Sequence, residues 1–298
     1  MIKKVGILGS GFGLYGYLPC FSNNKYKVYT LLRYKKKILL RKDLRKYEKK
    51  INFVSDTNEL LNISDIIVIA KRPSDQENLI KKIIKKKLFL KEYFFEKPFC
   101  SSPLKSIHYF NLLNKRKVKF RIGYLFLYTK FYKKFLKNKN KNLELIWKLK
   151  SFDLNKKKLT WKLSHRKGGG IIRFYAIHFF PLLSIIGKNW KITKSKIFTK
   201  KNFPISWEFE CFFKLKKLSI YLDINSTSNN FKFKSSKKRI YKSCSPFGDI
   251  VNIRNQDYRI KFLKKLINDN RKKFLLKNYY NSLKIWKNIE DRTKIIKL

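Results

Sequence analysis

Two short stretches of the chain, Gly9 to Gly13 and Glu96 to Pro98, hold residue types that could serve a ligand site. In the first stretch, three glycines spaced two apart follow an apolar run. Glycine allows positive φ and a close approach of backbone to ligand, and the N–H groups that open a following helix can hold a phosphate. In the second stretch, Lys97 stands between an acid and a proline, so its backbone is restricted and a charge lies beside it.

The order around the glycines is strand, tight turn, helix, which is typical of the pyrophosphate-binding turn of a dinucleotide fold. The motif is incomplete, because Leu14 stands where a third glycine is expected and Gly13 comes one residue early. The expected cofactor contacts in this turn are Gly9, Ser10, Gly11, Phe12 and Gly13.

The alternative for the same residues is a targeting segment, since Lys3 and Lys4 precede an apolar stretch. Five glycines make a poor apolar helix, and Pro19 is a poor residue just before a cleavage point. The dinucleotide interpretation is therefore preferred.

The elements that must position these residues alternate between strand and helix. Strands are expected at 26–33, 65–70 and 88–95, and the middle one is a continuous apolar run of the kind found in a parallel strand covered on both faces. The alternation predicts a doubly wound parallel sheet of the Rossmann type. Ligands bind at the carboxyl ends of such strands, so Ala70, Glu96 and Lys97 are expected beside the cofactor.

Arg33 ends the second expected strand, where folds that prefer NAD often place an acid. A guanidinium there can neutralise a 2′-phosphate, so the sequence favours NADP over NAD. A solvated arginine at a strand end is the competing interpretation.

The second half of the chain reads as a separate domain, and the expected limits are 1–120 and 121–298. Strands are expected at 143–152, 191–198, 206–213 and 218–225, and clean alternation over 207–211 indicates a sheet with one solvated face. Residues 171–186 are predicted to form a helix that contains His178 and ends at Gly187 as its C′ residue. The fold class is thus α/β, with a Rossmann domain followed by an α+β domain with an open, mostly antiparallel mixed sheet.

The formal net charge of +54 raises the possibility of a nucleic-acid binder. Lysine is spread through nearly every segment, however, which fits drift toward AT-rich codons better than one binding face, so no specific nucleic acid is expected. Four scattered cysteines argue against a disulfide framework or a structural zinc site, and no metal site is expected. They fit a reducing cytosol, and the absence of a long uncharged apolar run argues against a membrane span, so a cytoplasmic location is expected.

With these residues in view, the chain resembles the glucose-fructose oxidoreductase, inositol dehydrogenase and MocA (Gfo/Idh/MocA) family over nearly its whole length. The matching features occur in the expected order; they are the glycine turn with Leu18-Pro19, the 65–70 strand, Glu96-Lys97-Pro98, Trp161-Lys162, Gly168-Gly169-Gly170, His178 and Gly187. The resemblance implies hydride transfer between NAD(P) and a carbinol or carbonyl of a sugar, nucleotide sugar or cyclitol. It also implies that Lys97 is the active-site lysine and that His178 is the general acid/base, and it suggests a homo-oligomer.

The chain departs from the family pattern at three positions. Phe174 stands where members usually carry an aspartate, Tyr17 where many have a histidine, and Gln76 where another histidine often follows the fourth strand. Tyr128, Trp161, His165 and Phe174 are expected around the substrate. The Phe174 departure leaves a second function open, a dinucleotide-binding protein with little or no turnover.

Overall fold

The structure is a computed structural model, and it describes residues 2–23, 25–151, 154, 160–187, 190–201, 203–249 and 257–298. The described chain groups into two compact units. The first unit holds residues up to 100, 108–125 and 257–272, and the second holds 101–107, 126–249 and 273–298. The expected domain limits, 1–120 and 121–298, stay a prediction. The units themselves are discontinuous in sequence, because the segment 257–272 belongs to the first one.

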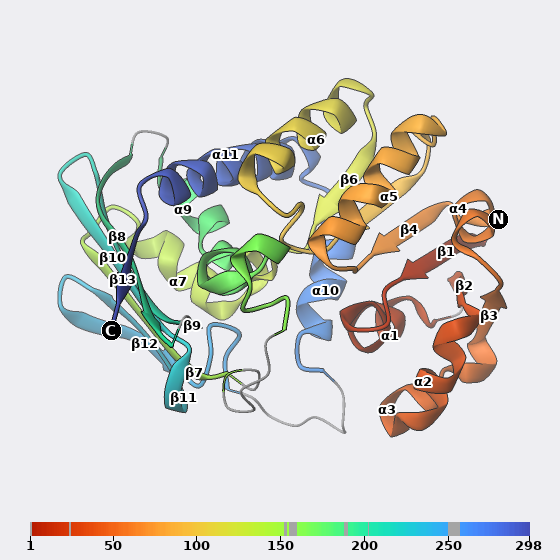
Figure 1. The fold of residues 1–298 in the computed structure, drawn as a ribbon, viewed down its shortest axis with the longest axis horizontal. Helices are drawn as coiled ribbons and strands as arrows, with labels where there is room; N and C mark the ends of the chain where they lie inside the picture. The colour runs from red at the N-terminus through yellow and green to blue at the C-terminus, as the bar shows by residue number, and fades with distance from the viewer. Residues whose placement is uncertain are drawn as a thin grey trace. The chain divides into compact units, whose positions relative to one another are not determined.

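The first unit is built on a six-stranded parallel sheet in the order β3-β2-β1-β4-β5-β6 (Figure 1). Its strands are β1 (Lys3–Leu8), β2 (Tyr26–Leu31), β3 (Ile51–Val54), β4 (Ile66–Ile69), β5 (Glu92–Phe95) and β6 (Lys119–Ile122). All four residues of β4 are buried, as its continuous apolar run predicts for a strand covered on both faces. The 3-2-1-4-5-6 order is that of a doubly wound dinucleotide fold, so the predicted Rossmann sheet is confirmed.

Helical segments connect these strands, apart from α10 (Ile260–Ile267), which comes from the C-terminal part of the chain and packs within this unit. The connecting segments are η1 (Gly13–Tyr17), α1 (Leu18–Phe21), η2 (Leu32–Tyr34), α2 (Lys35–Leu40), α3 (Lys42–Arg45), η3 (Glu48–Lys50), α4 (Thr57–Ile63), α5 (Pro73–Lys85) and α6 (Pro103–Lys115). The helix that follows the glycine turn begins as a π-type turn, η1, and continues directly into α1.

The second unit holds a seven-stranded mixed sheet in the order β12-β11-β7-β10-β9-β8-β13. Its strands are β7 (Leu143–Lys150), β8 (Trp190–Lys200), β9 (Phe203–Phe213), β10 (Lys216–Asp223), β11 (Asn225–Ser235), β12 (Lys238–Ser243) and β13 (Lys294–Lys297). The pairs β7–β10 and β8–β13 are parallel and the other pairs are antiparallel, which confirms the predicted mixed sheet. Phe152, the expected end of β7, lies outside the described residues.

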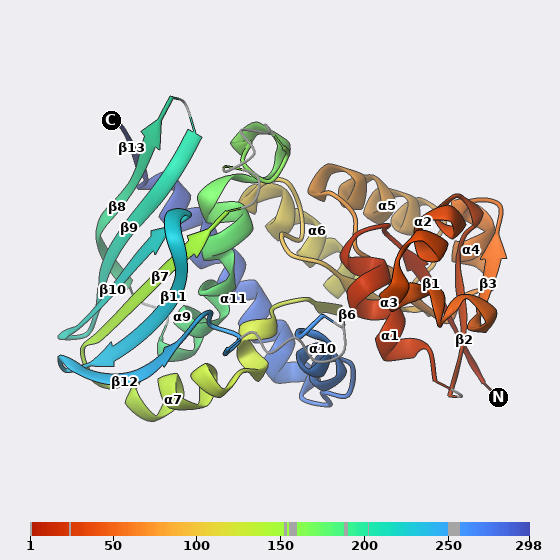
Figure 2. The same ribbon diagram turned by 90° about the horizontal axis from the view of Figure 1, so that it is seen from below.

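One face of this sheet is covered by helices. Figures 1 and 2 both place α7 (Lys130–Asn138), α9 (Phe180–Ile186) and α11 (Lys272–Asp291) on the same side of it. On β9, Trp207, Phe209 and Cys211 are buried, whereas Glu208 and Glu210 reach Lys194 and Lys217 at 2.5 and 3.0 Å. The alternation predicted for 207–211 is therefore confirmed.

The helix predicted over 171–186 is present but irregular. It runs as a π-type turn η6 (Ile171–Tyr175), a 3-10 turn η7 (Ala176–His178) and then α9. Pro181 lies in the first turn of α9, where its missing N–H leaves no backbone bond to lose. Gly187 directly follows the last residue of α9, as predicted for the residue that ends this helix, and its backbone is extended, with φ 169°. A Cβ there would come within 1.8 Å of the Phe213 ring, so tight packing explains the glycine. Among the helices of the described residues, none has an apolar stretch sufficient to cross a bilayer.

Candidate functional site

The glycine turn closes tightly on one side and is open on the other. Gly9 has φ +143°, and an added Cβ would lie 2.2 Å from the carbonyl oxygen of Ala70, so only glycine fits. A Cβ on Gly13 would lie 3.3 Å from the Ile7 side chain. At Gly11, in contrast, a Cβ would meet no described atom within 4 Å. The turn therefore packs against the end of β4 and leaves free space in front of Gly11, where a ligand could approach the backbone.

Phe12 does not fill that space, because its ring folds back over Gly16. A Cβ on Gly16 would lie 2.5 Å from the Phe12 ring. The ring also meets Tyr15 and Tyr17 edge to face, with centroids 5.5 and 5.7 Å apart. Ser10 lies in the turn and is half-buried.

Glu96 lies in a polar cluster at the end of β5. Tyr17 donates a hydrogen bond of 2.9 Å from its hydroxyl to Glu96 Oε1, and a Cβ on Gly123 would lie 2.5 Å from the same oxygen. Burial raises the pKa of Glu96 to about 7, although the charges of Lys97 and Arg259 and the Tyr17 hydrogen bond act to lower it. Glu96 therefore titrates near neutral pH.

Gln76 holds the loop that carries Lys97. Its Nε2 donates to the carbonyl oxygens of Glu96 and Phe99 at 2.8 Å each and to that of Pro98 at 3.3 Å. Lys97 itself is half-buried, is joined to Pro98 by a cis peptide bond, and belongs to the first unit. Tyr17 and Gln76, seen in the sequence only as departures from a family pattern, thus both support the Glu96–Phe99 loop.

Basic residues gather at the ends of β2 and β4. Arg33 is exposed and lies 5.6 Å over the ring of Tyr34. Burial lowers the pKa of Lys71, and the nearby charges of Arg33 and Arg72 act in the same direction, against Asp75. These three cations sit at the strand ends where a dinucleotide fold holds its cofactor.

His178 belongs to the second unit and is packed among aromatic rings. It is 7% exposed, stacks on Phe126 with centroids 4.6 Å apart, and meets Phe247 edge to face at 5.8 Å. These contacts are those of a core histidine, and the role in proton transfer that the family resemblance implies for it stays a prediction.

Two of the residues expected around the substrate are in contact. Phe174 meets Trp161 edge to face at 5.4 Å, and Lys162 Nζ lies 5.7 Å over the Phe174 ring. The aspartate position is therefore part of an aromatic group with a cation over it. Tyr128 lies in η4 (Leu125–Tyr128) and is half-buried.

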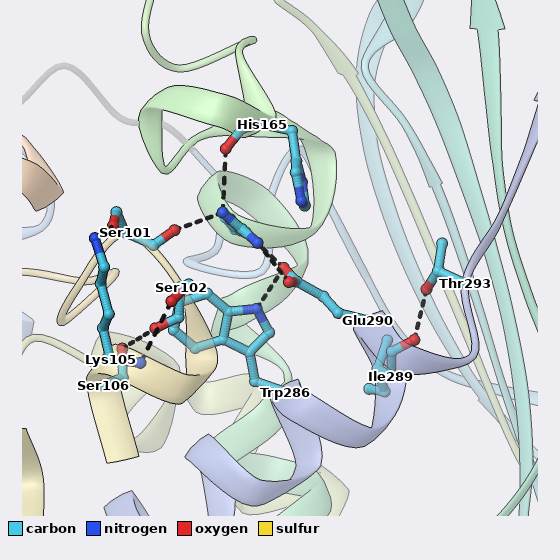
Figure 3. Close-up of polar contacts among 10 residues, drawn as sticks. Ser101, Ser102, Lys105, Ser106, His165, Trp286, Ile289, Glu290 and Thr293 are labelled. Atoms are coloured by element: carbon cyan, nitrogen blue, oxygen red, sulfur yellow. Dashed lines mark hydrogen bonds and ion pairs between the residues drawn. The ribbon is translucent and has the colours of Figure 1, made fainter. Parts of the chain in front are cut away.

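Arg173 links three segments of the second unit, and sequence reasoning missed it. Its Nε and Nη2 donate to Glu290 of α11 at 2.7 and 2.6 Å, and its Nη1 donates to the carbonyl oxygens of Ser101 and His165 at 2.5 and 3.1 Å (Figure 3). Trp286 Nε1 donates to Glu290 as well, at 2.7 Å. An arginine inside a mostly apolar helical run was the available signal.

The Arg173 network also affects His165, which lies in η5 (His165–Lys167). Burial lowers the pKa of the His165 imidazole, and the Arg173 charge lowers it further, while Glu290 acts in the opposite direction. Burial and the Arg173 charge thus both disfavour the protonated form of His165. Within the described residues, no group of three or more His, Cys, Asp and Glu side chains could hold a metal ion.

Comparison with known proteins gives matches in structure alone. No protein-family model matches the sequence, and no curated protein sequence does. A mutant of KijD10, a 3-ketoreductase from Actinomadura kijaniata in complex with TDP-benzene and NADP, matches with a TM-score of 0.77 at 10% identity over 100% of both chains. The WlbA (WbpB) dehydrogenase from Thermus thermophilus, in complex with NAD and UDP-GlcNAcA, matches with a TM-score of 0.69 at 12% identity over 99% of this chain and 97% of its own.

The dehydrogenase MviM from Clostridium difficile matches with a TM-score of 0.66 at 15% identity, over 98% of this chain and 99% of its own. The chain has the fold of these enzymes. The likeness extends over both units and covers nearly the full length of each neighbour.

Proposed function

We propose that the protein is an NAD(P)-dependent oxidoreductase of the Gfo/Idh/MocA type that transfers hydride between the nicotinamide and a carbinol or carbonyl of a sugar-like substrate. The observation that carries the proposal is the glycine turn at the end of β1, with its open side at Gly11, in a parallel sheet of 3-2-1-4-5-6 order. Neighbours of the same fold bind NADP or NAD and ligands with a nucleoside diphosphate. A nucleotide sugar is accordingly the proposed substrate class.

The residues at the turn fit a dinucleotide. Gly9 and Gly13 let the turn pack against Ala70 while the space before Gly11 stays open for a diphosphate. Arg33, with Lys71 and Arg72 nearby, offers positive charge for a 2′-phosphate, which supports the preference for NADP.

When bound, the nicotinamide supplies or accepts the hydride. In the proposed reaction the Lys97 ammonium hydrogen-bonds the reacting oxygen and stabilises its alkoxide form. His178 holds or releases the hydroxyl proton, because imidazole titrates near neutral pH. Gln76 and Tyr17 keep the Lys97 loop in place through the contacts described above.

The test is an absorbance assay of the purified protein with NADPH or NADP against a panel of sugars and nucleotide sugars. We expect a change in nicotinamide absorbance with at least one nucleotide sugar and a lower Kd for NADPH than for NADH. No detectable binding of either cofactor would overturn the proposal.

A second candidate function is a dinucleotide-binding protein with little or no turnover. Two observations favour it. Phe174, at the position where members of the resembled family usually carry an aspartate, lies in an aromatic group, and His178 is packed against apolar rings. Tight cofactor binding without an absorbance change on any substrate would support this candidate over the enzyme.

A further inference from the structure

The C-terminal part of the chain returns to the glycine turn. The segment 257–272 belongs to the first unit, and its helix α10 packs against η1 and α1. Cys20 Sγ donates to the carbonyl oxygen of Ile260 at 3.8 Å, a contact between residues 240 positions apart. The turn that precedes α10 therefore lies beside the residues that follow the glycines.

Arg259, in that turn, is fixed on two sides. Asp257 accepts from Arg259 Nε at 2.9 Å and from its Nη2 at 2.7 Å. The guanidinium carbon lies 4.2 Å from the ring centroid of Phe12, and Phe12 is the residue between Gly11 and Gly13. A guanidinium has five N–H donors, so the Asp257 contacts leave both Nη1 hydrogens for a different acceptor.

Arg259 also lies within electrostatic range of the strand ends. Its charge acts on the half-buried carboxyl of Glu96, at the end of β5. A second arginine, Arg41, is held in the same way by Asp43 and lies 5.1 Å over Tyr15, the ring that Arg259 approaches at 5.9 Å. The chain has only 19 acidic residues for 73 basic ones, and two of those acids orient guanidiniums around this turn.

We infer that Arg259 is a diphosphate-binding residue: its guanidinium, stacked on Phe12 and oriented by Asp257, donates its Nη1 hydrogen bonds to the phosphate groups of a dinucleotide at the glycine turn. The planar fork of arginine suits phosphate oxygens, and such charge-assisted bonds are the stronger class. The inference rests on the proposed function and adds a cofactor residue from the C-terminal segment, far from the glycine motif.

The experiment compares Arg259→Gln with Arg271→Gln. Arg271 has the same local geometry, since Asp269 accepts from its Nε at 3.0 Å and its Nη2 at 2.6 Å, but its side chain is 52% exposed. Equilibrium binding of NADPH and of ADP is measured for both variants and the unchanged protein, at temperatures below each melting transition. ADP carries the diphosphate without the nicotinamide, so it isolates the proposed contact.

We expect Arg259→Gln to weaken NADPH and ADP binding by the same factor, at least about tenfold, as for loss of one charge-assisted hydrogen bond. Arg271→Gln should leave both Kd values unchanged, and Arg259→Lys should restore part of the affinity, because it returns the charge without the fork. If Arg259→Gln does not fold, Arg259→Lys replaces it, with an expected loss of ADP affinity.

Two results separate the possible failures. If the unchanged protein binds NADPH and the Arg259 variants bind it equally well, Asp257 and Arg259 only fix the C-terminal segment and the inference is overturned. If the unchanged protein binds neither NADPH nor NADH, the proposed function fails and the inference fails with it.

Discussion

At the level of single residues, the proposed chemistry depends on Lys97, on a loop held by Gln76. We predict that Lys97→Ala lowers turnover by about 10²–10⁴-fold, the range for loss of a group that assists proton movement, while the Kd for NADPH stays within a few-fold. The measurement is a steady-state assay together with a cofactor titration. Lys85→Ala, an exposed lysine on α5, is the control and should change neither value. Turnover close to that of the unchanged protein in Lys97→Ala would refute the assigned role.

Glu96 makes stability depend on pH. Its pKa is raised by burial from 4.5 to about 7 in the folded protein, so between these values the folded state binds more protons than the unfolded state. The free energy of unfolding should therefore fall as pH rises from about 4.5 to about 7. Urea unfolding across this range measures the fall. Glu96→Gln keeps an acceptor for Tyr17 and should flatten the profile, and an unchanged slope in that variant would contradict the assignment.

Phe174 should set substrate preference more than stability. Phe174→Asp removes ring contacts with Trp161 and Tyr175, each worth about 1 kcal/mol, and places a carboxylate near Lys162. We expect a modest fall in melting temperature and a changed order of activities across the panel of sugars and nucleotide sugars. The same order of activities, with every rate reduced alike, would argue against a substrate role.

Part of the candidate site could be predicted from the sequence, and the part that could not depends on distant contacts. Gly9 and Gly13 follow from the spacing of the turn, although the carbonyl oxygen that excludes a Cβ at Gly9 belongs to Ala70, at the end of β4. Four site or supporting residues were not identified from the sequence: Tyr17, Gln76, Arg173 and Arg259. Their partners are, in the same order, Glu96, the 96–99 loop, Glu290 and Phe12, and each partner is distant in the sequence. Such pairings are created by the fold and leave no local pattern.

At the scale of elements, the ion pair between Arg173 and Glu290 fastens α11 to η6. Their side chains are 10% and 12% exposed, so removing one partner leaves a buried charge. We predict that Arg173→Met or Glu290→Gln costs about 3–5 kcal/mol of unfolding free energy, and that Arg173→Met with Glu290→Met costs less than the sum of the single changes. Urea unfolding in a double-mutant cycle measures this.

A surface pair on the same helix provides the comparison. Lys287 and Asp291 are 2.6 Å apart with side chains 39% and 53% exposed, so Lys287→Ala should cost less than about 1 kcal/mol. Equal costs for the two pairs would show that α11 is not held by Arg173.

Strands were easier to predict than helices in this chain. The continuous apolar run of β4 reflects burial on both faces of that strand. The alternation in β9 reflects burial on one face only. The 171–186 stretch is apolar on most sides, so its periodicity could not reveal the change from π-type to 3-10 to α-helical turns. Gly187 ends the helix as predicted, but the reason for a glycine there is the Phe213 ring, on a strand that follows later in the chain.

At the scale of the whole molecule, the structure has two units, and the chain passes from one to the other more than once. The first carries the glycine turn, Lys97 and Arg259, and the second carries His178, Phe174 and Arg173. The helix-free face of the second sheet has ion pairs among its side chains, such as Lys234 with Glu144 at 3.0 Å. The homo-oligomer that the family resemblance suggests stays a prediction. The net charge of +54 should help anionic nucleotides arrive without specifying them.

The most direct test of the account is NADPH binding to Gly11→Val. Gly11 lies outside the left-handed φ range, and a Cβ there meets no described atom within 4 Å, so the variant should fold with an unchanged melting temperature. Its side chain would occupy the space proposed for the diphosphate. The account predicts that the Kd for NADPH rises at least about tenfold, the equivalent of one lost charge-assisted hydrogen bond. A folded Gly11→Val that binds NADPH as tightly as the unchanged protein would contradict it.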